Sequence, residues 1–144
     1  MYQFINTLHS YTRWVLLILI VVVLFKAAMG WFGKRPYTKS DNMWSVSLLG
    51  LTHLQALGGL ILYFFLSPIT LSAFADFGAA MKDKYLRFYA VEHLTIMLLA
   101  VVMIQLGRTL SKKAIGAEAK HKKLFIYTLI GLVLILAGIP WDKI

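Results

Sequence analysis

The stretch WVLLILIVVVLFKAAMGWF, residues 14–32, decides the fold of this chain. Lys26 is its only ionisable residue, and the stretch is otherwise apolar from end to end. An α-helix needs about 20 predominantly apolar residues to cross the hydrocarbon core of a bilayer. The stretch therefore predicts a transmembrane helix, in which the aliphatic stem of Lys26 lets the ammonium group reach the nearer interface.

Three more apolar runs follow and cover most of the remaining chain. They lie at about 44–66, 86–107 and 124–139, and the second stops before Ser67-Pro68, where proline removes a backbone donor. The connections are too short for a separate soluble module, so one domain is expected over residues 1–144. We predict an all-α integral membrane four-helix bundle of up-down-up-down topology, with a short interfacial helix in the connection at 67–84.

The composition supports a membrane protein and excludes several other classes. Of the 144 residues 60% are hydrophobic and 15% are charged, which is too apolar for an ordinary soluble domain. The net charge of +9 lies in loops between apolar runs, not on one continuous face, so nucleic acid is not an expected partner. Cysteine is absent, which excludes disulfides, thiolate metal sites and covalent c-type haem.

The distribution of basic residues predicts the orientation in the membrane. Nine of the 15 basic residues fall in the first and third loops. They are Lys34, Arg35, Lys39, Arg108, Lys112, Lys113, Lys120, Lys122 and Lys123. By the positive-inside rule this side is cytoplasmic, so both termini are expected outside (N-out, C-out) in a bacterial inner membrane.

Ionisable residues within the predicted spans are the candidates for function, because polar groups in a bilayer are costly. Lys26 apart, the candidates are His53, Glu92 and His93. A b-type haem needs two axial imidazoles from different helices, and His53 and His93 are the first-choice pair of iron ligands. The structural alternative is that each histidine makes a hydrogen bond between helices and that the small residues near it only permit close packing.

His9 is the substitute ligand. His53 and His93 differ in expected depth by about 7 to 8 Å, whereas bis-imidazole ligation needs similar depths. A site near the outer interface would instead combine His9 with His93, with Arg13 or Arg87 binding the haem propionates. Arg13 is also read as an interfacial anchor beside Trp14. His121 lies in a lysine-rich run, where we expect it to be solvated and not a ligand.

Glu92 permits a second kind of site. With His9 and Arg13 it would bind a quinone headgroup, and the structural alternative pairs it with Arg13, Arg87 or Tyr89. Motifs of hydrolases and nucleotide-binding enzymes do not occur in the sequence. An electron-transfer protein or an accessory subunit, in a homo-oligomer or beside other membrane subunits, is therefore favoured over an independent enzyme.

Four segments resemble a known family. They are LHSYTRWV at 8–15, THLQALGGLILYF at 52–64, LRFYAVEHLTIM at 86–97 and AGIPW at 137–141. They are similar to a family of small four-helix membrane proteins from Bacteroidota that is commonly labelled "cytochrome B". The resemblance covers nearly the whole chain and implies a haem-binding, respiratory inner-membrane protein, with His53, His93 and His9 as the positions to test.

Overall fold

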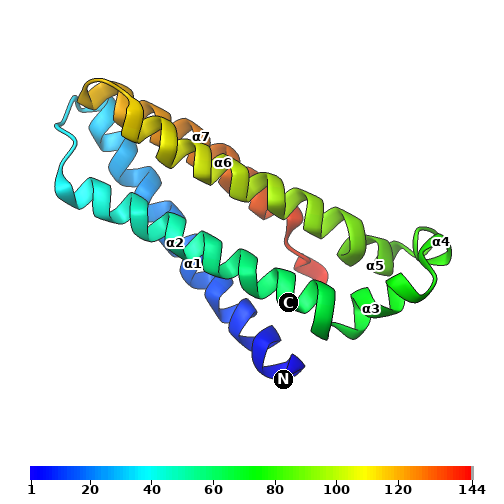
Figure 1. Ribbon diagram of the computed structural model, residues 1–144. Helices are drawn as coiled ribbons and strands as arrows, with labels where there is room; N and C mark the ends of the chain where they lie inside the picture. Colours follow the sequence, from blue (N-terminus) through cyan, green and yellow to red (C-terminus); the bar gives the residue numbers. More distant parts are fainter. Residues whose placement is uncertain (144) are drawn as a thin grey trace.

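The structure is a computed structural model that describes residues 1–143, and it is all-α over that range (Figure 1). This confirms the fold class predicted from the apolar runs. The long helices are α1 (Tyr2–Phe32), α2 (Lys39–Ile61), α6 (His93–Lys113) and α7 (Ala117–Gly138). The short elements are η1 (Leu62–Leu66), α3 (Pro68–Ala75), α4 (Phe77–Ala80), α5 (Lys84–Arg87), η2 (Phe88–Glu92) and η3 (Trp141–Lys143).

Four continuous helical segments are long and apolar enough to cross a membrane, so the chain is a multi-pass membrane protein. They are Tyr2–Phe32, Lys39–Leu66, Lys84–Lys113 and Ala117–Gly138. Each extends beyond the range expected from the apolar run, because helical hydrogen bonding continues into polar residues that water or headgroups can solvate. The first segment exceeds its predicted range by the most residues, because the helix begins at Tyr2 and includes His9 and Arg13.

The four long helices lie side by side, and each runs back along the previous one (Figure 1). α7 packs against α6 and α1, while α2 packs against α1 and α6, so every long helix has two long neighbours. The residues between them form one apolar core that includes Leu16, Ile20, Leu48, Ile104 and Ile135. The outward faces are also apolar, with Ile18 and Phe25 each 66% exposed, as expected where lipid is the solvent.

The connection after the second span contains α3 and α4, so the short helix expected at 67–84 is present. Pro68 stands in the first turn of α3, where its missing N–H costs nothing. Thr70 Oγ1 donates to the carbonyl oxygen of Tyr63 at 2.6 Å and holds α3 against the end of the second span.

Two π-helical turns interrupt the second and third spans next to this connection. They are η1 and η2, and the hydroxyl of Tyr63 in η1 donates to the carbonyl oxygen of Ala90 in η2 at 2.6 Å. A π turn changes the helical phase of everything beyond it, and such turns occur frequently at functional sites. Here both turns are at the end of the bundle where the candidate site is found.

Candidate functional site

A cavity of about 440 Å³ lies between α1, α2, α6 and the segment after α7. Its size falls within the roughly 300–1,000 Å³ of small-molecule and cofactor pockets. Most of its wall is apolar, with a few polar side chains directed at one space. The polar side chains that line it include His9, Arg13, Gln55, Tyr89 and His93.

His93 is the first residue of α6, directly after η2. Its Nδ1 is 2.7 Å from the carbonyl oxygen of Gly138 at the end of α7. Because a carbonyl oxygen only accepts, Nδ1 carries the hydrogen and Nε2 keeps a free lone pair. Metal-ligating histidines are commonly oriented in this way by a hydrogen bond on the other ring nitrogen.

His9 enters the cavity from α1 and packs over two glycines of α2. A Cβ placed on Gly59 would lie 3.2 Å from Cε1 of His9, so glycine leaves the room that the imidazole ring occupies. The Gln55 side-chain amide donates to the carbonyl oxygen of His9 at 2.9 Å and fixes this part of α1 against α2. The Nδ1 atom of His9 is buried and has no hydrogen-bond partner among residues 1–143.

Arg13 lies one helical turn after His9 and lines the same cavity. Its Nε atom is buried without a hydrogen-bond partner in the described part of the chain. The guanidinium also lies over the ring of Trp14, 5.0 Å from the ring centroid, which agrees with the interfacial-anchor interpretation. Arg13 can line the cavity and also act as an interfacial anchor, because the guanidinium has five N–H donors.

His53 does not line the cavity. It is exposed on α2, and its Nε2 lies 3.0 Å from Oε1 of Gln105 on α6. Its neighbour Thr52 does line the cavity, and successive residues of a helix point about 100° apart. The structure therefore brings His9 and His93 together at one cavity and leaves His53 in the interhelical hydrogen bond that was the structural alternative for this residue.

Arg87 and Glu92 pair with each other outside the cavity. Nε of Arg87 donates to Oε1 of Glu92 at 2.9 Å, and both side chains are nearly half exposed. Five residues is a poor separation for a pair on an α-helix, but η2 lies between them and a π turn brings positions five apart onto one face. The pairing of Glu92 with Arg87 was one of the alternatives left open by the sequence.

The expectation that His121 is solvated is wrong. His121 is 1% exposed, and its Nε2 lies 3.3 Å from the carbonyl oxygen of Pro36. It packs on Gly30 of α1, where even a Cβ would overlap the ring. The neighbouring lysines on α7 point outward, but helical phase turns His121 inward toward α1. It is far along the bundle from His9 and His93 and does not line their cavity.

Two residues of the site were not found by sequence reasoning. Tyr63 lines the cavity and bonds η1 to η2, and Gly59 makes room for His9. The Gly58-Gly59 pair within an apolar run was a usable signal, because adjacent glycines in a transmembrane helix permit close approach. Nothing in the sequence indicated the role of Tyr63, which depends on two π turns.

Within residues 1–143, no group of three or more histidine, cysteine, aspartate or glutamate side chains is placed to hold a metal ion. A metal site built from side chains alone therefore has no support. A prosthetic group that brings its own equatorial donors needs only the two imidazoles that this cavity offers. No protein-family model, curated protein or solved structure matches the chain.

Proposed function

We propose that the chain binds a b-type haem in the cavity between α1, α2 and α6, with His9 and His93 as the axial ligands. In this role it passes electrons or serves as the membrane subunit of a larger redox assembly in a bacterial inner membrane. The proposal is supported by two imidazoles from different helices that line one largely apolar cavity.

One observation carries the proposal. The Nδ1 of His93 is engaged by Gly138, which leaves Nε2 available, and the Nδ1 of His9 is buried without a partner. A buried polar atom without a partner costs stability unless something absent from the protein itself satisfies it. Coordination to an iron atom would satisfy both imidazoles, since either ring nitrogen can be a ligand.

Arg13 fits the second requirement of a haem site, a cation for the propionates. Arg13 lines the cavity one helical turn from His9, and its buried Nε has no partner among the described residues. Arg87 is the weaker choice because Glu92 already neutralises it outside the cavity. A guanidinium binds a carboxylate through two parallel hydrogen bonds, which would fix the orientation of the macrocycle.

The test is a dithionite-reduced minus oxidised visible spectrum of the protein purified in mild detergent from haem-replete cells. We expect a sharp α band of b type. We expect both His93→Ala and His9→Ala to remove that band, because each takes away one axial ligand. His53→Ala is the matched control, since it removes an imidazole from the same bundle but outside the cavity, and it should keep the full band.

Two outcomes would change the assignment. Loss of the band in His53→Ala together with its retention in His9→Ala would restore His53 and His93 as the ligand pair. A colourless, stably folded protein would remove the haem and favour a cofactor-free accessory subunit, whose co-purifying partners would then be identified.

A quinone is the second candidate occupant. His9 and Arg13, each with an unpartnered nitrogen, line a mostly apolar cavity, and such a lining also suits the carbonyl oxygens and the ring of a quinone. Glu92 takes no part in this version because it is paired with Arg87. A colourless protein whose melting temperature rises with a short-chain quinone, and no longer rises in Arg13→Gln, would support this function in place of haem.

A further inference from the structure

A second cavity of about 340 Å³ lies at the other end of the bundle, where α1 turns into α2. It is separate from the cavity lined by His9 and His93, and nothing in the haem proposal uses it. Its wall combines charged residues with apolar residues of α1, including Lys26, Arg35, Asp41, His121, Phe25 and Met29.

His121 forms the buried wall of this cavity. Its Nε2 bonds to the carbonyl oxygen of Pro36, so Nε2 carries a hydrogen. Its Nδ1 is buried and has no hydrogen-bond partner among residues 1–143. A bound molecule that supplies a hydrogen-bond partner to Nδ1 would satisfy this unpartnered atom.

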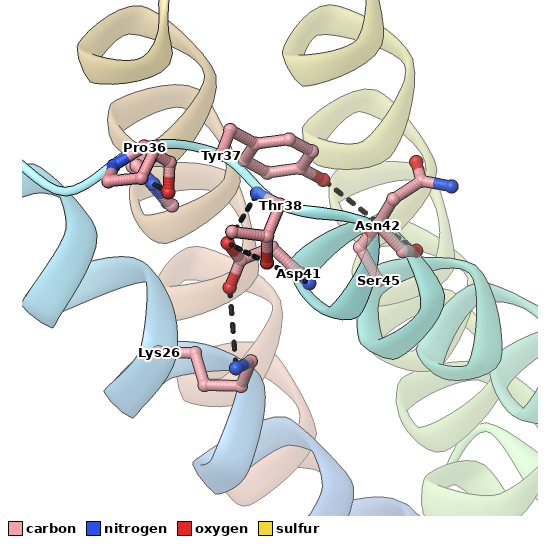
Figure 2. Close-up of polar contacts among 8 residues, drawn as sticks. Lys26, Pro36, Tyr37, Thr38, Asp41, Asn42 and Ser45 are labelled. Carbon is pink, nitrogen blue, oxygen red and sulfur yellow. Dashed lines mark hydrogen bonds and ion pairs between the residues drawn. The ribbon is translucent and has the colours of Figure 1, made fainter.

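Lys26 is held in place by a network at the start of α2 (Figure 2). Its Nζ lies 3.4 Å from Oδ1 of Asp41. The other oxygen, Oδ2, accepts from the backbone N–H of Thr38 at 2.9 Å and from the Thr38 hydroxyl at 3.0 Å. The sequence predicted that the ammonium group of Lys26 extends toward the nearer interface; in the structure it is paired with Asp41 beside the cavity, with the side chain 31% exposed.

Arg35 supplies the accessible cation. It is exposed at the rim of the cavity, and in the described part of the chain its guanidinium takes part in no hydrogen bond or ion pair. The wall therefore carries two basic side chains, Lys26 and Arg35, against the single carboxylate of Asp41. A guanidinium with five free donors suits the oxygens of a phosphate group.

We propose that this cavity binds the phosphate of an anionic phospholipid headgroup. The apolar part of its wall decides between a lipid and free phosphate. Phe25 is 66% exposed and Met29 is 37% exposed on α1 beside the cations, so an acyl chain would continue along the helix from a bound headgroup. This is the end with most of the basic residues, and basic pockets between transmembrane helices on the cytoplasmic side bind such headgroups.

The test is native mass spectrometry of the purified full chain, titrated with phosphatidylglycerol in detergent. We expect one saturable lipid adduct and much weaker binding of zwitterionic phosphatidylcholine. Arg35→Gln should weaken phosphatidylglycerol binding about tenfold, the loss expected for one charge-assisted contact. Arg35→Lys keeps the charge but loses the bidentate geometry. Its affinity for phosphatidylglycerol should lie between those of the unchanged protein and Arg35→Gln.

Lys39→Gln is the matched control, because it removes one positive charge from the same end of the bundle but not from the cavity. It should leave the affinity unchanged. An equal loss in Lys39→Gln and Arg35→Gln would mean diffuse attraction and overturn the site. Equal binding of phosphatidylcholine would overturn the preference for anionic lipid, and displacement of the lipid by inorganic phosphate at the same concentration would make free phosphate the occupant.

Discussion

At the scale of single residues, two glycines of the membrane helices have opposite surroundings. Gly30 has the ring of His121 where its own Cβ would be, whereas Gly50 has nothing within 4 Å of that position. The same amino acid therefore serves close packing at one position and has no packing role at the other. Sequence alone does not separate them, because the difference depends on which side chain of α7 faces α1.

This contrast gives a matched pair of substitutions. Gly30→Ala should lower the free energy of unfolding by about 1–3 kcal/mol, the usual cost of overpacking a buried site. Gly50→Ala should leave it unchanged or raise it by about 0.5–1 kcal/mol, because alanine favours the helix. Thermal unfolding of the two proteins in the same detergent measures the difference. Equal melting temperatures would contradict the tight contact between Gly30 and His121.

The identity of the candidate ligands could be predicted from the sequence, but their pairing could not. His53 and His93 stand out because polar residues are rare in apolar runs, and His9 lies just before the first run. Whether two of them meet depends on helical phase, and η2 shifts that phase directly before His93. The sequence analysis assumed a regular α-helix, in which Arg87 and Glu92 are unfavourably spaced for an ion pair. The π turn brings the two side chains onto one face, where they pair.

At the scale of elements, the apolar runs identified all four membrane helices but underestimated their lengths. Hydropathy reports where lipid contacts a helix, whereas the helix itself ends where hydrogen bonding or capping stops it. The second span begins at a capping box between Thr38 and Asp41, several residues before its apolar run. Hydropathy does not reveal the two π turns, because an average over apolar residues carries no information on which backbone groups pair.

The bond between the π turns can be tested directly. Tyr63→Phe removes the hydroxyl that donates to Ala90 and should cost about 0.5–1.5 kcal/mol of stability, the net value of one hydrogen bond. It should also disturb whatever occupies the cavity, because η2 positions His93. Tyr11→Phe is the control, since Tyr11 is 69% exposed and its hydroxyl makes no hydrogen bond within residues 1–143. Unfolding curves in mixed detergent compare the two, and equal loss in both would refute the structural role of Tyr63.

At the scale of the whole molecule, the two cavities are at opposite ends of a bundle whose outer surface is apolar. The basic loops share one end with the second cavity, and the histidine-lined cavity shares the other end with α3 and α4. If the positive-inside rule holds, the cavity lined by His9 and His93 faces the outer side and the proposed lipid site faces the cytoplasm.

Orientation can be measured cleanly because the chain contains no cysteine. Ile115, 95% exposed between α6 and α7, and Gly78, exposed in α4, mark the two ends. In intact cells that admit small molecules to the periplasm, a membrane-impermeant maleimide should label Gly78→Cys and not Ile115→Cys. Both should react after the membrane is permeabilised. The reverse pattern in intact cells would invert the proposed topology.

The hydrogen bond from His93 to Gly138 also sets an order of events during biosynthesis. The two residues are 45 positions apart, so the ribosome makes the second about 2–9 s after the first. Until then the imidazole of His93 has no fixed tautomer, and the wall contributed by Ile135, Ile139 and Pro140 does not exist. The cavity is therefore not complete until α7 and the segment after it have been made and packed, and a ligand that needs all of its walls would bind only after that step.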